Sequence, residues 1–178
     1  MSIWINGIGQ VERTDPRLRY PTWSHIWTDP ETGGELWMGG TGDREDFLYG
    51  YEPGKFDPEV TTEHFDSCAT LYAAAGPVDW GVAEYRFGFG DQPLDAQHAP
   101  RVYAVADWVI DELKQGHRVL VRCQAGLNRS GIVTGLVLGQ HAKMTGLEAI
   151  SRIRSRRTLF CLSNDDFYQH LVEAFPAA

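Results

Sequence analysis

The sequence predicts an α/β fold: a central mixed, mostly parallel sheet flanked by helices, with a polar loop between one strand and one helix. Two observations predict it. A helical pattern over residues 100–113 leads through Gly116 into the apolar run Val119–Val121, which is typical of a short buried strand. Polar residues follow this strand, and apolar residues return at helical spacing after Ser130. A strand, a helix and a further strand in this order form a crossover, so neighbouring strands run parallel.

The N-terminal part of the chain is the least regular. Residues 1–35 are rich in aromatic residues and in turn formers, and we interpret them as an extension packed on the domain. Within them, Ile3–Ile5 has the composition of a short edge strand, and Leu36–Gly40 then predicts a strand closed by glycines. Asp43 is a candidate cap of a short helix, and residues 52–58, with two prolines and a glycine, predict a surface loop.

The middle of the chain alternates between strands and helices. Cys68–Tyr72 predicts a strand that ends at Gly76, and the period-2 alternation of residues 82–87 predicts a second strand. The loop Gly88–Pro93 follows, before a helix that Pro100 opens. The apolar positions of this helix form one stripe: Val102, Ala106, Val109, Ile110 and Leu113.

The last third of the chain predicts three helices. The first runs from Ser130 to about Met144. The last follows the capping sequence Ser163–Asp166 and carries Phe167, Leu171 and Phe175 on its apolar face. The helix between them has one apolar face, made by Leu147, Ile150 and Ile153.

A run of arginines loads the opposite face of that middle helix and the residue after it: Arg152, Arg154, Arg156 and Arg157. Such a charge run is usually a solvated face, and we interpret it so. The alternative is recognition of a second phosphate on a polyanionic substrate, such as an inositol lipid or an RNA 5′ end.

Composition predicts one globular domain spanning residues 1–178, since 43% of the residues are hydrophobic. The net charge of -8 argues against nucleic acid or an anionic membrane as the main partner. The most apolar helix is too short for membrane insertion, and the start of the chain lacks the features of a signal peptide. Three cysteines at unrelated spacings fit a reducing compartment. We therefore expect a cytoplasmic protein, and we take it to be a monomer.

The loop after the predicted strand is a candidate anion site. Cys123 faces the helix start at Ser130, where unpaired backbone amides and the helix dipole converge and stabilise both an anion and a thiolate. Gly126 permits a positive φ that turns amides inward, and Arg129 can hold an oxyanion with a bidentate fork. A buried structural cysteine is the alternative. The candidate phosphate-binding residues are Gln124, Ala125, Gly126, Leu127, Asn128 and Arg129.

The pattern Cys-x5-Arg-Ser-Gly at Cys123–Gly131 is the signature of cysteine-dependent phosphatases, and the chain resembles their dual-specificity branch. The stretch Asn164–Leu171 is similar to the "Asn-x-x-Phe-x-x-x-Leu" ending of that branch. The resemblance runs from about Leu36 to Phe175 and is specific mainly at the signature. It implies hydrolysis of phosphomonoesters through a phosphocysteine, on phosphotyrosine and/or phosphoserine/threonine of proteins. The mechanism needs no cofactor, and because the histidines lack ligand spacing we predict no metal.

The resemblance also implies roles for four residues. Cys123 attacks phosphorus, while Arg129 and the loop amides stabilise the phosphoryl oxygens. Asp91, on the loop before the long helix, is the general acid, and nearby Asp95 is the alternative. Without a catalytic role, Asp91 would be an ordinary turn residue. Ser130 stabilises the sulfur as it leaves the phosphocysteine.

Two features leave alternatives open. Family members usually carry His before the cysteine, whereas this chain has Arg122, which cannot accept the hydrogen bond that orders the loop. Either the positive charge of Arg122 favours the Cys123 thiolate, or the Arg122 side chain points away from Cys123. Cys68 is either a protective disulfide partner of Cys123, as the resemblance allows, or an inert buried thiol.

The alternative functions follow from these features. Arg122 permits a catalytically weak, phosphate-binding pseudophosphatase. A phosphatase acting on a phosphoinositide or an RNA 5′ phosphate is a second alternative. A rhodanese-like sulfurtransferase or an arsenate reductase also uses an anion-cradling cysteine loop, but neither gives Asp91 or Ser130 a role.

Overall fold

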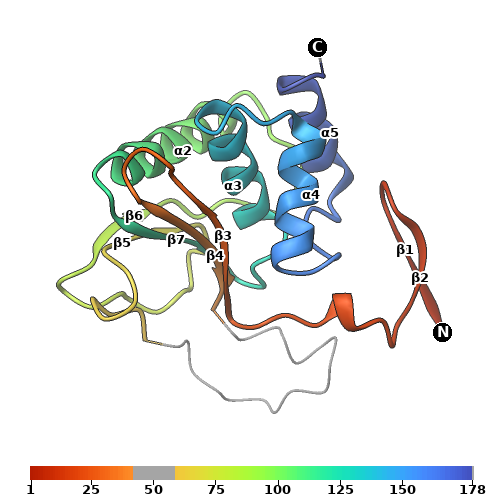
Figure 1. Ribbon diagram of the computed structural model, residues 1–178, viewed down its shortest axis with the longest axis horizontal. Helices are drawn as coiled ribbons and strands as arrows, with labels where there is room; N and C mark the ends of the chain where they lie inside the picture. Colours follow the sequence, from red (N-terminus) through yellow and green to blue (C-terminus); the bar gives the residue numbers. More distant parts are fainter. Residues whose placement is uncertain (42–58, 178) are drawn as a thin grey trace.

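A computed structural model describes residues 1–41 and 59–177 of the chain, and within them five strands form a mixed sheet of order β3-β4-β7-β5-β6 (Figure 1). Strand β3 pairs antiparallel with β4, and the remaining neighbours are parallel. This confirms the predicted α/β class. The bounds are β3 Trp23–Thr28, β4 Glu35–Gly40, β5 Ser67–Thr70, β6 Ala83–Arg86 and β7 Arg118–Cys123.

The helices of the described chain pack against one face of this sheet, in a single core that they share with β4, β5 and β7 (Figure 1). Their bounds are α2 Ala99–Lys114, α3 Arg129–Gln140, α4 Gly146–Arg156 and α5 Asp165–Ala174. The other face is covered by a smaller cluster that includes Phe65, Val82 and Leu120. None of these helices is long and apolar enough to cross a membrane.

The helices form where their sequence patterns predict them, with one boundary corrected. The apolar stripe of α2 is buried, and Gly116 follows its end with a φ of 82°. Helix α3 ends at Gln140, short of Met144, because Thr145 caps α4 with a capping box: it accepts from the Glu148 amide while the Glu148 carboxylate accepts from the Thr145 amide. The apolar face of α4 is narrower than predicted, since the Leu147 side chain is 54% exposed.

The N-terminal segment contains more regular structure than the sequence predicts. Residues 3–5 do lie in a strand, β1 (Ser2–Ile5), which pairs with β2 (Gly9–Glu12) in a separate hairpin. The 3-10 turn η1 (Pro16–Leu18) follows. Strand β3 has no clear sequence signal because its buried positions carry Ser24 as well as Ile26, while its tryptophans lie at the alternating, less buried positions. The predictions for Asp43 and for residues 52–58 lie outside the described residues.

Candidate active site

The candidate nucleophile lies at the carboxyl end of the central strand. Cys123 is the last residue of β7, which runs parallel to β4 and β5 on its two sides, and its side chain is 2% exposed. The Gly126 amide donates to Cys123 Sγ at 3.2 Å, and Ser130 Oγ lies 3.3 Å from the same sulfur. Helix α3 begins at Arg129, so its N-terminus points at this thiol. Two hydrogen-bond contacts and a helix N-terminus therefore converge on this one sulfur.

The loop keeps its tight shape because its neighbours approach closely. Gly126 has a φ of 67°, and a Cβ at this position would overlap the backbone of Gly39 and Gly40 at the end of β4. The Thr41 amide donates to the Gln124 carbonyl at 2.9 Å, and the Arg157 Nε donates to the Gly126 carbonyl at 2.7 Å. These contacts fix the carbonyls outward, which leaves amides directed at the anion site.

Arg129 is held beside the loop that precedes α2. Its Nη1 donates to the Phe89 carbonyl at 3.1 Å, and its guanidinium lies 5.4 Å from the centre of the Tyr72 ring. The Phe89 side chain is buried and lies against Phe167 of α5, so this loop is anchored on both sides. Because one edge of the guanidinium is used in this way, the opposite edge remains for a bidentate contact with an oxyanion.

Asp91 lies against the nucleophile loop through two side-chain amides. Asn128 Nδ2 donates to Asp91 Oδ2 at 2.9 Å, and Asn164 Nδ2 donates to Asp91 Oδ1 at 2.8 Å. Asn164 also caps α5 and donates from its backbone amide to the Asn128 side chain at 3.1 Å. The sequence predicted a capping sequence at Ser163–Asp166 but gave no signal for the bond between Asn164 and Asp91, which joins residues 73 positions apart.

Asp95 is engaged elsewhere. Its side chain accepts from the backbone amides of Gln97 and His98 and from the His98 ring at the start of α2, at 2.9, 2.7 and 2.8 Å. These bonds to His98 and Gln97 hold the pKa of Asp95 below its usual range. The structure therefore brings Asp91, and not Asp95, into hydrogen-bond contact with the nucleophile loop.

Arg122 points away from the nucleophile. Successive residues of a strand face opposite sides, so Arg122 lies on the sheet face opposite Cys123 and is only 1% exposed. Its Nε donates to Thr70 Oγ1 at 3.0 Å, its Nη2 donates to the Gly76 carbonyl at 2.5 Å, and the same nitrogen lies 3.6 Å from Glu84. The second of the two sequence interpretations therefore holds. Arg122 braces β5, β6 and β7, and its charge is balanced by Glu84.

We expect Arg122→Met to lower the free energy of unfolding by about 2 kcal/mol, because it removes the positive partner of a buried ion pair. The loss is below that of a fully buried pair since the Glu84 side chain is 20% exposed and keeps its contact with Arg86 at 3.0 Å. Unfolding in guanidinium chloride measures it, with exposed Lys114→Met as the control. An unchanged unfolding midpoint in Arg122→Met would show that the network adds no stability.

Cys68 lies across the sheet from Cys123, in the cluster that contains Leu120. Burial raises the pKa of the Cys68 thiol to about 11, so it stays protonated at neutral pH. This position favours the inert thiol over the disulfide partner. Cys161, which shares the larger core with Cys123, is equally buried, and burial raises the pKa of its thiol to about 11 as well.

The arginine run of α4 and the residue after it does not form a solvated face throughout. Arg156 is exposed, but Arg154 and Arg157 are 6% and 5% exposed and donate to backbone carbonyls. Among residues 1–41 and 59–177, no cluster of three or more His, Cys, Asp or Glu side chains could hold a metal ion.

The sheet order and the strand–loop–helix at Cys123 form a fold similar to that of dual-specificity phosphatases. Comparison with known proteins agrees. Residues 94–176 match the family model of the dual specificity phosphatase catalytic domain. The resemblance drawn from the signature is therefore confirmed. No curated protein sequence matches the chain.

Solved structures show the same fold. Human DUSP28 superposes with a TM-score of 0.61 at 18% identity, covering 88% of this chain and 97% of that one. OH1 of Orf virus, described as a tyrosine phosphatase with triple substrate specificity, gives 0.58 at 19% identity, with 92% of each chain covered. A mouse putative dual specificity phosphatase gives 0.55 at 20% identity, covering 94% of this chain and 96% of that one.

Proposed function

We propose that the chain hydrolyses phosphomonoesters through a phosphocysteine at Cys123, acting on phosphotyrosine and/or phosphoserine/threonine of proteins. The observation that carries the proposal is the pair of hydrogen-bond contacts at Cys123 Sγ, from the Gly126 amide and the Ser130 hydroxyl at the start of α3. A structural cysteine needs neither contact, whereas a nucleophilic thiolate is stabilised by both.

In the first step, the Cys123 thiolate attacks phosphorus, the P–S bond forms and the bond to the leaving oxygen breaks. The loop amides and Arg129 stabilise the charge on the phosphoryl oxygens, since both are positioned before the substrate arrives. Asp91 donates a proton to the leaving oxygen, from a position that Asn128 and Asn164 fix beside the loop.

In the second step, water attacks the phosphocysteine, the P–S bond breaks and inorganic phosphate leaves. Asp91, now a carboxylate, accepts the proton of that water. The Ser130 hydroxyl donates to the departing sulfur, which it can do from 3.3 Å. This division of labour supports phosphatase chemistry over a sulfurtransferase or an arsenate reductase, in which Asp91 and Ser130 have no role.

Two alternatives lose support. The first is the pseudophosphatase, which the sequence left open because of Arg122. The Arg122 side chain contacts Thr70, Gly76 and Glu84 and lies away from the Cys123 thiol. Two of the arginines considered for a second phosphate, Arg154 and Arg157, line a separate groove whose described lining does not include Cys123, which disfavours a phosphoinositide or an RNA 5′ end as substrate.

The proposal is tested by trapping the intermediate. The native protein is mixed with a 32P-labelled aryl phosphate, quenched with acid and digested, and we expect the label on the peptide that contains Cys123. The steady-state rate of aryl phosphate hydrolysis by the native protein is measured in parallel across about pH 5–8. A protein that binds vanadate but neither turns over nor becomes labelled would favour the phosphate-binding pseudophosphatase.

We expect Asp91→Asn to lower kcat by about 100-fold for an alkyl phosphate and by about tenfold for an aryl phosphate, because only the poorer leaving group depends strongly on the proton. Steady-state kinetics with both substrates measure the difference. Asp95→Asn is the matched control and is expected to keep near-native kcat, since Asp95 bonds to Gln97 and His98 and not to the nucleophile loop. Loss of activity in Asp95→Asn alone would reverse the assignment of the general acid.

A further inference from the structure

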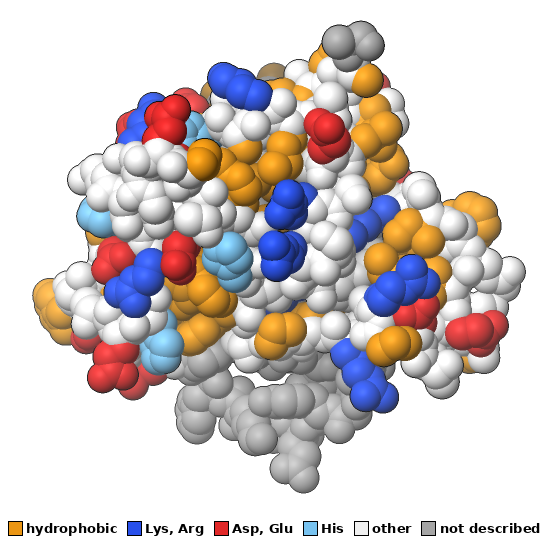
Figure 2. Space-filling view, viewed as in Figure 1, with side chains coloured by type: hydrophobic (Ala, Val, Ile, Leu, Met, Phe, Trp, Pro, Cys, Tyr) orange, Lys and Arg blue, Asp and Glu red, His pale blue; other side chains and the backbone are white. Residues whose placement is uncertain are grey.

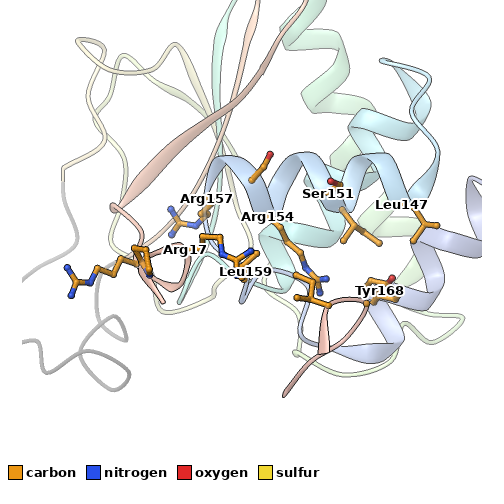
Figure 3. Close-up of a pocket in the computed structure, with 13 residues that line it drawn as sticks. Arg17, Leu147, Ser151, Arg154, Arg157, Leu159 and Tyr168 are labelled. Atoms are coloured by element: carbon orange, nitrogen blue, oxygen red, sulfur yellow. The ribbon is translucent and has the colours of Figure 1, made fainter. Parts of the chain in front are cut away.

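A groove of about 620 Å³ separates the N-terminal hairpin from the body of the domain (Figure 3). The turn of the hairpin at Gly7 and Ile8 forms one wall, η1 forms a second, and α4 forms the third with Ser151 and Arg154. We call it the arginine groove. Its volume is in the range of sites that bind ligands.

The groove is basic in an acidic protein. Four of the described residues that line it are arginines, namely Arg17, Arg19, Arg154 and Arg157, and no described lining residue is Asp or Glu, although the chain carries a net charge of -8. Arg17 forms an ion pair with Asp15 at 2.6 Å, so Arg19 and Arg154 supply the charge that a partner would meet. Figure 2 shows Lys and Arg side chains across the middle of this face and beside the hairpin. A local positive field in a negative molecule selects a discrete anionic partner.

Arg154 is the central feature of the groove, between Arg157 and Tyr168 in Figure 3. Its side chain is 6% exposed, and its guanidinium donates to neutral acceptors: the carbonyls of Cys161, Leu162 and Asn6, and the Asn6 side chain. Among the described residues, no carboxylate lies within ion-pair distance of it. Burial lowers the pKa of the Arg154 guanidinium below its usual range. An anion in the groove would offset the cost of this buried charge.

The groove also presents apolar surface. Ile150 and Leu159 lie buried at its base, while Ile8 and Leu147 are 43% and 54% exposed at its rim. The Tyr168 ring also lines the groove, and its centre lies 5.4 Å from the Arg154 guanidinium. A bare inorganic anion would leave this apolar rim in water, so the occupant carries apolar groups beside its charge.

We infer that the arginine groove binds an acidic, partly apolar peptide segment of a protein partner. A peptide supplies carboxylates for exposed Arg19 and near the buried charge of Arg154, and aliphatic side chains for Ile8 and Leu147. An anionic membrane is disfavoured because the molecule as a whole is negative. The inference is independent of the proposed catalysis, although Arg157 lines the groove and also donates to Gly126 of the nucleophile loop, so a bound segment lies near that loop.

The test is fluorescence anisotropy of the full chain with a labelled twelve-residue peptide that alternates Glu and Leu. We expect saturable binding that weakens as salt rises from about 50 to about 500 mM, because the attraction is screened. Arg19→Glu, at an exposed position, is expected to raise Kd by roughly tenfold, and Leu147→Ser by roughly threefold. Lys114→Glu makes the same charge change outside the groove and is expected to leave Kd unchanged.

Three results would overturn the inference. The first is equal Kd values for the native protein, Arg19→Glu and Leu147→Ser, since the peptide would then bind elsewhere. The second is displacement of the peptide by millimolar inorganic phosphate, which would make the groove a phosphate site. The third is binding to vesicles of anionic phospholipid without binding of the peptide. Because both variants are at exposed positions, a folding defect does not obscure the outcome.

Discussion

Cys123→Ser is expected to lower kcat for aryl phosphate hydrolysis by at least about 10⁴-fold. The serine oxygen occupies nearly the same place and can accept the Gly126 amide, so the loop is expected to keep its shape. Its hydroxyl is not ionised at neutral pH, and a serine phosphate would be a poor leaving group in the second step. The variant should still bind phosphate or vanadate, because the amides and Arg129 are unchanged.

Cys68→Ser is the matched control for this substitution. It makes the same chemical change in a buried thiol on the other face of the sheet, where the side chain already contacts Thr70 Oγ1 at 3.6 Å. Near-native turnover is expected in this control, alongside loss in Cys123→Ser. Turnover that survives in Cys123→Ser would sink the phosphocysteine mechanism, whereas loss in both variants would point to a general folding defect.

The features that the sequence predicts are those governed by local pattern. The apolar stripe of α2, the run Val119–Val121 and the helical spacing after Ser130 each reflect neighbours a few residues apart. The Cys123–Gly131 signature is also local, and the loop it predicts does bring the Gly126 amide and the Ser130 hydroxyl to the sulfur. A local pattern is therefore enough for the centre of the site.

The features that the sequence did not predict depend on partners far along the chain. Asp91 accepts hydrogen bonds from the side chains of Asn128 and Asn164, which become neighbours only when α5 packs beside the loop. The sequence predicted Arg154 and Arg157 to be solvated. Burial of a guanidinium needs carbonyl acceptors, and here these come from the distant residues Asn6 and Gly126. The orientation of strand β7 decides on which face of the sheet the Arg122 side chain lies, and the sequence left both faces open.

Arg129→Lys is expected to lower kcat/KM by about 10³-fold, although the charge is conserved. The guanidinium uses Nη1 to hold the Phe89 carbonyl at 3.1 Å, and in the proposed mechanism its other edge contacts two phosphoryl oxygens. An ammonium is a single point donor and cannot make both contacts at once. The same substitution should also loosen the loop that carries Asp91, since Phe89 is two residues away from it. We therefore expect kcat to fall and the inhibition constant of vanadate to rise together.

Arg156→Lys provides the control, because Arg156 is exposed and its conservative replacement is expected to change neither quantity. Steady-state kinetics with an aryl phosphate, together with vanadate inhibition, separate the two roles of Arg129. A fall in kcat with unchanged vanadate inhibition would mean that Arg129 acts through the Phe89 carbonyl and the position of Asp91, and not through the phosphoryl oxygens. Full activity in Arg129→Lys would contradict the bidentate contact itself, since a lysine can supply charge at this place but not the planar fork.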